Sequence, residues 1–356
     1  MPYRVIQWST GNVGRFALRA ILGHPELELV GLWVSGAKAG KDAGEICGLP
    51  PAGVRATSDA DVLLALDADC VCYTATADLR PFEAIEDVCR ILASGKNVVS
   101  SSIVPLVHPK SFFAETREKL EAACREGRSS FWTSGIDPGF ANDLLPLVLS
   151  GLCEKWEQIR CQEIINYATY DQPQVLFETM GFGKPMDHTS LLLAPGSITF
   201  AWGGTIRLLA EGLGVGLEEI RESHERRPAV KPIAIGEHVV GPGTMAALRF
   251  ELEGIVGGRP AIVVEHVTRL DDDLAPEWPQ GRGYRVIITG VPSLCCNLDF
   301  ADETGDLAMG GVLLTATRLV NAIPAVCAAP PGLLSALDLP LVTGRGLHAA
   351  ARGSEA

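Results

Sequence analysis

A short glycine-containing loop near the N-terminus has residue types and spacing that suggest a specific chemistry. In the G-x-G-x-x-G pattern of dinucleotide-binding loops, Ser9 stands at the first glycine, whereas Gly11 and Gly14 match the second and third. Gly11 would let the main chain approach a pyrophosphate, and Gly14 would let the next helix pack on the preceding strand. The alternative is a purely structural turn. We expect the cofactor to be contacted along this loop by Ser9, Thr10, Gly11, Asn12, Val13 and Gly14.

The end of the second strand bears on which dinucleotide is bound. Sites for NAD usually carry an acid here, which bonds to the ribose 2′-hydroxyl. This chain instead has Ser35, Lys38 and Lys41, and no acid before Asp42. A hydroxyl and two ammonium groups suit a 2′-phosphate, so the sequence favours NADP(H) over NAD(H). The alternative is that the lysines are only solvated and that both cofactors bind.

Later strand ends should add contacts, because ligands of open α/β sheets bind at the carboxyl ends of the strands. Apolar runs predict strands over Cys70–Thr74 and Asn97–Ser101. We expect further cofactor contacts there from Thr74, Ala75, Thr76 and Ser101.

Reduction of a carbonyl or imine by a dinucleotide needs a proton donor beside the reacting atom. The first three candidates lie in loops. His108 follows strand 97–101 at the ligand-binding edge of the sheet, or is a surface histidine before Pro109. His188 follows a glycine-rich loop, and is either close to a substrate or at an ordinary loop tip. Glu178 begins the segment 178–185 and would supply a carboxylate if that segment moves toward the site.

The other candidates lie on or beside strands of the second half. His266 would face the opposite way from Glu265, and its competing role is a core histidine satisfied by a backbone carbonyl. Tyr167 could donate a proton, although packing is the commoner role. Asp137 could act as an acid, but holding the turn before Pro138 is favoured.

Several other catalytic patterns do not occur in the sequence. It contains no G-x-S-x-G, no His-x-Glu-x-x-His zinc spacing and no C-x-x-C pair. The acidic run Asp271–Asp273 lacks the glycine and distal glutamate of an EF-hand loop, so we expect it to be solvated. We predict no bound metal.

The order of elements predicts an α/β protein that begins with a Rossmann-type, doubly wound parallel sheet. Strand Tyr3–Trp8, the glycine loop, a helix over Arg15–Leu22 and strand Leu27–Val34 make one βαβ unit. The alternation of helices and strands continues over Val62–Leu66, Cys70–Thr74, Phe82–Ser94, Asn97–Ser101, Lys110–Glu126 and Ser129–Thr133.

A second, α+β domain with a mainly antiparallel sheet follows, because several long runs alternate apolar and polar residues. Strands are predicted over Gln158–Tyr170, Val230–Val239, Ala246–Val256, Pro260–Leu270 and Tyr284–Leu294. Helices are predicted over 140–151, 174–180, 204–213 and 217–224, with a last one over Gly310–Ala322.

Charge and cysteine content narrow the partners and the compartment. A formal net charge of −13 would repel a nucleic-acid backbone. The N-terminus lacks the pattern of a signal peptide, and no run of 18 apolar residues predicts a membrane span. Ten cysteines without C-x-x-C spacing suit small buried side chains in a reducing compartment. We expect a cytoplasmic protein with a small-molecule substrate and with neither nucleic-acid nor membrane partners.

Four segments in order resemble the dihydrodipicolinate-reductase-like group, within it the 2,4-diaminopentanoate dehydrogenases and native amine dehydrogenases. They are IQWSTGNVGR, GIDPGFANDLLP at 135–146, ETMGFGKP at 178–185 and TATRLVNAIPAVCAAPPGLLSALDLP at 315–340. The resemblance implies NAD(P)H-dependent interconversion of an amine with an imine or carbonyl, and a homodimer. It also places Ile136–Asn142 near the nicotinamide, so Asn142 is expected to contact the cofactor, as is Asn321 on a returning helix.

The resemblance and the pattern together predict three parts of the chain. The dinucleotide-binding domain would cover 1–140, with the returning helix at about 308–323. The substrate and dimerisation domain would cover 141–307, and a C-terminal segment 324–356.

One departure from the family pattern concerns the reaction itself. In the amine dehydrogenases a glutamate that polarises ammonia or the amine follows the fourth strand, but here Ile103 or Val104 stands in its place. We therefore expect an NADP(H)-dependent oxidoreductase acting on a carbonyl, imine, alcohol or amine. The alternatives are an ammonia-using amine dehydrogenase, in which Glu178 or another acid takes the role, and a non-catalytic NADP-binding sensor.

The second domain shows few obvious cationic clamps, so the expected substrate is small to medium and mainly apolar. Arg207, Arg249 and Arg269 remain alternatives for binding a carboxylate.

Overall fold

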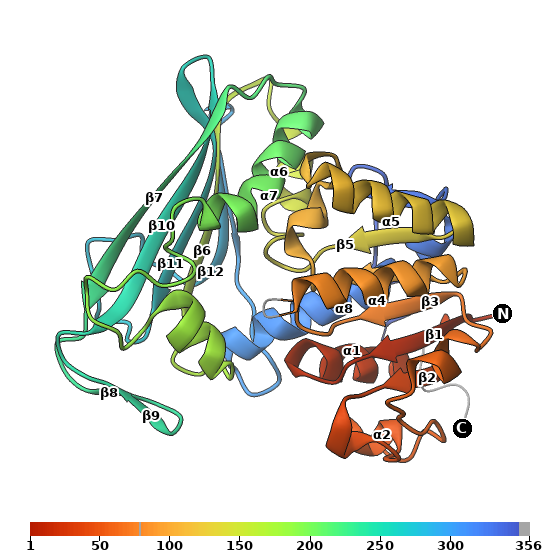
Figure 1. Cartoon of the computed structure of the whole chain (residues 1–356). Helices are drawn as coiled ribbons and strands as arrows, with labels where there is room; N and C mark the ends of the chain where they lie inside the picture. The colour runs from red at the N-terminus through yellow and green to blue at the C-terminus, as the bar shows by residue number, and fades with distance from the viewer. Residues whose placement is uncertain (78–79, 349–356) are drawn as a thin grey trace. The chain divides into compact units, whose positions relative to one another are not determined.

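The computed structural model describes residues 1–77 and 80–348, which form two compact units (Figure 1). The first unit is built from Met1–Gly135 together with the chain from Val312 onward, and the second is Ile136–Gly311.

The first unit contains a six-stranded sheet in the order β14-β5-β4-β3-β1-β2, in which every pair is parallel. The predicted Rossmann-type sheet is confirmed. One strand, β14, comes from the region predicted as a C-terminal segment. The strands are β1 (Tyr3–Trp8), β2 (Leu27–Trp33), β3 (Cys70–Tyr73), β4 (Asn97–Ser100), β5 (Ser130–Thr133) and β14 (Gly332–Leu334).

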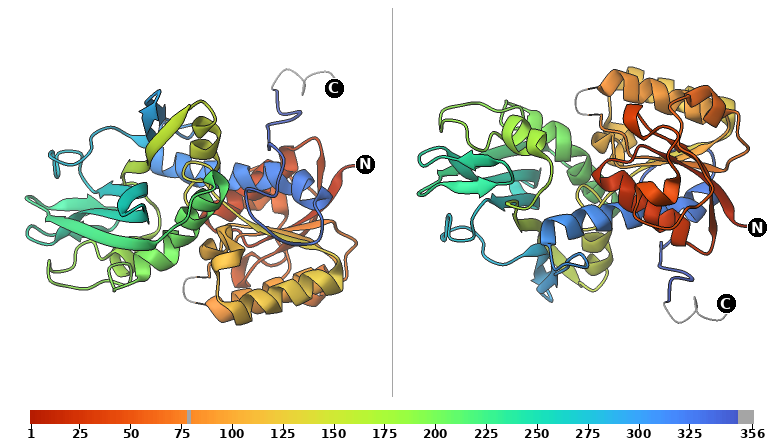
Figure 2. Two further views of the ribbon diagram at one scale, coloured as in Figure 1. Left: turned by 90° about the horizontal axis from the view of Figure 1, so that it is seen from above. Right: turned by 90° about the horizontal axis from the view of Figure 1, so that it is seen from below.

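Helices cover both faces of this sheet, as Figure 2 shows. On one face α1 (Asn12–Gly23) and α8 (Leu307–Ala328) share a buried cluster with Val5 and Cys72. On the other face α4 (Pro81–Ala93) and α5 (Ala114–Gly127) pack with Val71. Successive strand residues point to opposite faces, which explains why the continuous apolar run of β3 is buried throughout.

Short helices connect these elements. A 3-10 turn stands where the start of a longer helix at Lys110 was predicted, so that prediction was wrong by one turn: α5 begins only at Ala114. The short elements are η1 (Gly36–Lys38), α2 (Ala43–Ile46), α3 (Ala60–Leu64), η2 (Val104–Val107) and η3 (Pro109–Ser111).

The last helix, α8, is longer than its predicted range and contains Pro324 within it. By length and composition alone it could cross a membrane. However, Leu319, Val320 and Ile323 are fully buried in the core of the first unit. This burial is typical of a core helix in a globular protein.

The second unit contains a six-stranded sheet in the order β13-β12-β6-β11-β10-β7, with β6 and β11 parallel and the other pairs antiparallel. The predicted mainly antiparallel sheet is confirmed. Its strands are β6 (Lys155–Asn166), β7 (Glu219–Pro228), β10 (Met245–Val256), β11 (Arg259–Arg269), β12 (Gly283–Val291) and β13 (Leu294–Leu298).

Two predictions in this unit were wrong. Residues 217–224, predicted as a helix, lie largely in β7, because pairing with β10 outweighs their helical spacing. The single strand predicted over Val230–Val239 is a hairpin, β8 (Ile233–Ile235) and β9 (His238–Val240), turned at Gly236 with a φ of +56°.

The helices of the second unit are α6 (Leu144–Ser150) and α7 (Ser197–Leu213), and η4 (Val175–Met180) is a π-helical turn between them.

Candidate functional site

The glycine loop joins β1 to α1, as expected for a dinucleotide-binding turn. Ser9, at the place of the first glycine, has a φ of +80°, a conformation that side-chain-bearing residues rarely adopt. A Cβ at Gly14 would lie 2.4 Å from the Ser9 carbonyl oxygen and 2.7 Å from Thr74 Oγ1. A Cβ at Gly11 would meet no atom within 4 Å. Gly14 is therefore required by packing, whereas Gly11 leaves open space beside the main chain.

Side chains from neighbouring elements hold the loop in shape. Gln7 Nε2 donates to the Ser9 carbonyl oxygen at 2.8 Å and to Thr74 Oγ1 at 2.9 Å. Lys38 Nζ donates to the Thr10 carbonyl oxygen at 2.9 Å and lies 3.1 Å from Thr10 Oγ1. The structure thus brings the predicted Thr74 and Lys38 onto the loop itself.

The first acid after β2 has a structural task. Asp42 caps α2, where its Oδ1 accepts from the Gly44 and Ala52 amides at 2.8 and 2.7 Å, and its Oδ2 accepts from the Gly53 amide at 2.9 Å. Hydrogen bonds from the main chain, the one from Ala52 first, lower the pKa of this carboxyl group. Because both oxygens are engaged in the loop, Asp42 is not arranged as a ribose acceptor.

The other predicted cofactor residues have varied surroundings. Ser35, Lys41 and Thr76 are exposed, Ala75 is buried, and Ser101 and Asn321 are partly buried.

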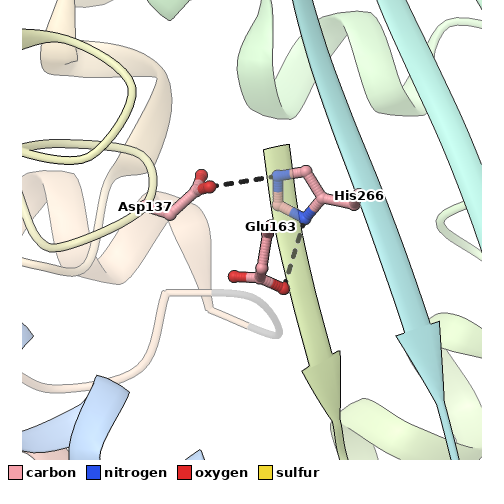
Figure 3. A group of neighbouring side chains, drawn as sticks. All are labelled: Asp137, Glu163 and His266. Atoms are coloured by element: carbon pink, nitrogen blue, oxygen red, sulfur yellow. Dashed lines mark ion pairs between the residues drawn. The ribbon is translucent and has the colours of Figure 1, made fainter. Parts of the chain in front are cut away.

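A second group of polar side chains is buried in the second unit. Glu163 on β6 and His266 on β11 are direct register partners on adjacent strands, so both point to the same face of the sheet. His266 Nδ1 lies 3.5 Å from Glu163 Oε1, and His266 Nε2 lies 3.2 Å from Asp137 Oδ2 (Figure 3). The ring is therefore held between two carboxylates. Asp137 belongs to the loop that precedes α6.

Further hydrogen-bond donors surround these side chains. We call Asp137, Glu163, His266 and the donors around them the acid–base cluster. Tyr167 Oη donates to Glu163 Oε1 and Tyr284 Oη donates to Glu163 Oε2, each at 2.8 Å. Asp137 Oδ1 accepts from two donors, Asn142 Nδ2 at 2.6 Å and Trp202 Nε1 at 2.8 Å.

Aromatic rings enclose the histidine. The Phe250 ring stacks on His266 with centroids 4.5 Å apart, and the Trp202 ring from α7 meets it edge-on at 4.7 Å. The surroundings of the imidazole are thus apolar on its ring faces and acidic at both nitrogens.

This environment sets the charge of the cluster. Burial by itself would lower the pKa of His266, but the carboxylates of Asp137 and Glu163 outweigh it and raise that pKa to about 10. Burial first, and then the charge of Glu163, raise the pKa of both Tyr167 and Tyr284 well above the usual value. At neutral pH the ring is an imidazolium, and both tyrosines remain hydrogen-bond donors.

The structure brings together three of the six side chains considered as proton donors, His266, Tyr167 and Asp137: Tyr167 and His266 contact Glu163, and Asp137 contacts His266. His108 lies in the first unit, where its buried ring contacts Ser111 Oγ at 2.9 Å. His188 is exposed, and Glu178 forms an exposed ion pair with Lys184. Neither makes a hydrogen bond or ion pair with the cluster.

Sequence reasoning missed Glu163, Tyr284 and Trp202, and treated Asp137 mainly as a turn residue. One signal was available: within the strand, alternation places Glu163 on the same face as Cys161 and Ile165, which are buried. A carboxylate on an apolar strand face needs a partner. No comparable pattern marks Tyr284 or Trp202, because their partners lie far away in the sequence.

Asn142, which was predicted to contact the cofactor, makes hydrogen bonds within its own loop. Its side chain donates to Asp137, and its Oδ1 accepts from the Gly139 amide at 3.0 Å. These bonds fix the Asp137 carboxylate beside His266.

Comparisons with known proteins agree with the fold. Residues 140–352 match the family model of the 2,4-diaminopentanoate dehydrogenase C-terminal domain. An amine dehydrogenase from Streptomyces virginiae is 45% identical over 346 residues, which cover 94% of this chain and 96% of that protein. The 2,4-diaminopentanoate dehydrogenase of Acetoanaerobium sticklandii is 24% identical over 263 residues, covering 72% and 70%.

Among solved structures, an amine dehydrogenase from Mycobacterium smegmatis has the same fold. Its TM-score is 0.77 at 20% sequence identity, and the match covers 96% of this chain and 97% of that one. The Rossmann-type unit and these relatives define an NAD(P)-dependent oxidoreductase. The chain belongs to the family of amine dehydrogenases and 2,4-diaminopentanoate dehydrogenases, as its sequence motifs had indicated.

Proposed function

We propose that this enzyme uses NADP(H) to interconvert a carbonyl or imine with an alcohol or amine on a small to medium, mainly apolar substrate. The observation that carries the proposal is the loop from Ser9 to Gly14. It has the strand–turn–helix setting, the close packing at Gly14 and the open space at Gly11 that a bound pyrophosphate requires. The acid–base cluster of the second unit is proposed to handle the proton.

The preference for NADP(H) is supported by the charges beside the loop. Lys38 is anchored on Thr10, and the exposed Ser35 and Lys41 belong to the same segment. Asp42 is occupied by main-chain amides and does not oppose a 2′-phosphate. A cationic segment without an available carboxylate favours the phosphorylated ribose.

The apolar character of the substrate is supported by the hydrogen bonds and ion pairs that two arginines of the second unit make within the fold. Arg249 pairs with Glu265 at 2.7 Å and with Glu251 at 2.8 Å. Arg269 donates to the carbonyl oxygens of Leu274 and Pro279 at 2.8 and 3.0 Å. Both guanidinium groups are engaged in the fold, which disfavours their use in binding a substrate carboxylate.

A second candidate, reductive amination with free ammonia, is favoured by the relatives and by the buried carboxylates. The segment after β4 carries the buried Ile103 and no acid. Asp137 and Glu163 are acids in the second unit that could take over the stabilisation of an ammonium group. The name of the Streptomyces virginiae relative points the same way.

The homodimer and the cytoplasmic location are part of the same proposal. The face of the second sheet opposite His266 carries an ion-pair network, in which Arg160 and Arg249 contact the buried Glu265 at 2.6 and 2.7 Å. We expect two copies to meet at this face, as the family resemblance implies a homodimer, and light scattering should give twice the mass of one chain. All ten cysteines are free thiols, as suits a reducing compartment.

The test is a fluorescence titration of the purified protein with NADPH and NADH, followed by a panel of ketones and aldehydes with and without ammonia. We expect NADPH to bind at least tenfold more tightly than NADH, and NADPH to be oxidised. Oxidation that requires ammonia would select the second candidate. Binding without turnover on any substrate would instead indicate a sensor, and no binding of either dinucleotide would overturn the proposal.

A further inference from the structure

We infer that Tyr167 is the catalytic residue that delivers the proton to the reacting oxygen or nitrogen, with Glu163 and His266 forming the relay behind it. The inference rests on the proposed function and specifies how the acid–base cluster serves it. No comparison assigns these residues, and the segment after β4 offers no acid for the task.

The two tyrosines of the cluster differ in one decisive way. Both donate to the carboxylate of Glu163 at 2.8 Å, but to different oxygens. Tyr284 lies within β12 and is only 4% exposed. Tyr167 follows the end of β6, is half-buried, and packs against the ring of Tyr170 with centroids 4.7 Å apart. A substrate can reach a half-buried residue beyond a strand end more readily than a residue enclosed within the sheet.

The relay follows from a shared oxygen atom. Glu163 Oε1 accepts the Tyr167 hydroxyl at 2.8 Å and lies 3.5 Å from His266 Nδ1. The other ring nitrogen faces Asp137 at 3.2 Å. The raised pKa of His266, about 10, keeps a proton on the ring at neutral pH. A tyrosinate left after proton donation would therefore be reprotonated from the ring through Glu163, since the pKa of Tyr167 is raised well above normal.

The chemical step balances with the cofactor that the family uses. The substrate carbon accepts a hydride from the reduced nicotinamide, and the C=O or C=N π electrons move to the oxygen or nitrogen. That atom forms its new bond to the proton of the Tyr167 hydroxyl. The tyrosine regains a proton from His266 through Glu163, and water ultimately replaces the proton of the ring. The carbon is reduced, the nicotinamide is oxidised, and one proton is consumed.

A metal site is the competing use of these side chains. One ligand atom from each of Asp137, Glu163 and His266 lies within 4.8 Å of the others, which is compact enough for an ion. However, the two carboxylates face different nitrogens of the ring, as Figure 3 shows. An ion beside Nε2 would be bound by Asp137 but not by Glu163, whereas an imidazolium satisfies both at once.

The matched pair Tyr167→Phe and Tyr284→Phe tests the assignment, because each variant removes one hydroxyl from the same carboxylate. The readouts are kcat and KM with saturating NADPH, NADPH affinity by fluorescence, and the melting temperature. We expect Tyr167→Phe to lower kcat about 100-fold or more with unchanged NADPH affinity. Tyr284→Phe should also lower kcat, but about tenfold less than Tyr167→Phe does, because it removes a hydrogen bond to Glu163 and leaves the proton donor in place. Both variants should lose similar stability.

The relay has its own readout, the dependence of kcat on the fraction of D₂O in the solvent. In the wild-type enzyme we expect a curved dependence, because more than one proton moves in the rate-limiting step. In His266→Gln it should become linear, a change that a purely structural role would not produce.

The outcomes separate this inference from the proposed function. A wild-type enzyme without turnover on any carbonyl or amine would overturn the function itself. Turnover in the wild type that survives in Tyr167→Phe, or that falls equally in both phenylalanine variants, would overturn only the role of Tyr167. Activity lost on treatment with a chelator and restored by a divalent cation would replace the relay by a metal site.

Discussion

The glycine loop of the first unit and the acid–base cluster of the second are built in opposite ways. The loop is a run of six neighbouring residues, Ser9 to Gly14, shaped by backbone conformation, by close packing at Gly14 and by hydrogen bonds from Gln7 and Lys38 to its carbonyl oxygens. The cluster gathers Asp137, Glu163, His266 and Tyr284 from four separate segments, and side chains make all its contacts. A site formed by neighbouring residues tolerates substitutions far away in the sequence. A site gathered from several strands depends on the register of the whole sheet.

The strongest test of this contrast is Glu163→Ala. The substitution leaves the hydroxyls of Tyr167 and Tyr284 and one nitrogen of His266 without their acceptor, in a buried setting. We expect the free energy of unfolding to fall by about 3–5 kcal/mol. Chemical denaturation would measure it, with the exposed Glu157→Ala on the same strand as the control. An equal loss of unfolding free energy in the two variants would mean that the buried Glu163 contributes no more to stability than the exposed Glu157.

The second prediction concerns pH. The pKa of His266 is raised in the folded state to about 10, so its stabilising effect is fully present below the unfolded value of about 6.5 and is lost as the pH rises toward 10. Between pH 7 and pH 9 this group alone should remove about 2 to 3 kcal/mol from the free energy of unfolding. Denaturation curves at these two values, repeated with His266→Gln, isolate the contribution. The same slope in both proteins would contradict an imidazolium in the cluster.

In the glycine loop, two glycines only three residues apart should behave differently. A Cβ at Gly14 would lie 2.4 Å from the Ser9 carbonyl oxygen, so Gly14→Ala should cost about 1–3 kcal/mol and abolish NADPH binding. Gly11→Ala has open space and should change stability by less than about 0.5 kcal/mol, while weakening NADPH binding. Thermal denaturation and fluorescence titration of the two variants give both quantities. An unfolded Gly11→Ala would show that the open space at this position is not available.

The smallest expected effect is on cofactor choice. Lys38→Ala should reduce the preference for NADPH over NADH about tenfold, or about 1.4 kcal/mol, because a cation beside the loop is lost. Lys41→Ala, measured in the same titration, tests the alternative that these lysines are only solvated. An unchanged preference in both variants would assign the 2′-phosphate to other groups.

The contrast also explains how much could be predicted from the sequence. The glycine loop could be predicted from the sequence because its pattern lies within one βαβ unit, and Ser9, at the place of the first glycine, has a φ of +80°. Strand and helix order sufficed for the type of both sheets, but β7, β13 and β14 were not predicted as strands. Of the cluster, His266 and Tyr167 were among the candidate proton donors, and so was Asp137, although its role in the turn was favoured.

The other residues of the cluster were not predicted because they become neighbours only through pairing between distant segments. Glu163 and His266 are 103 positions apart in the chain, and only the parallel pairing of β6 with β11 makes them neighbours. The error over 217–224 has a related cause: these residues have helical spacing, yet the hydrogen bonds of the neighbouring β10 fix them as a strand. A local sequence pattern does not reveal which distant segments will pair with it in the folded chain.

The cofactor-binding unit is assembled from both ends of the chain, and this affects its synthesis on the ribosome. Strand β14 pairs with β5, Ser130 Oγ donates to the Pro330 carbonyl oxygen at 3.1 Å, and Leu319 and Ile323 fill the core beneath β1. The nascent N-terminal part must therefore wait, with one sheet edge uncovered and one sheet face covered by α1 alone, while the whole second unit is translated. The sheet of the first unit is therefore complete only after the second unit has been synthesised, so a chain released before β14 would lack one strand and the α8 side of its core.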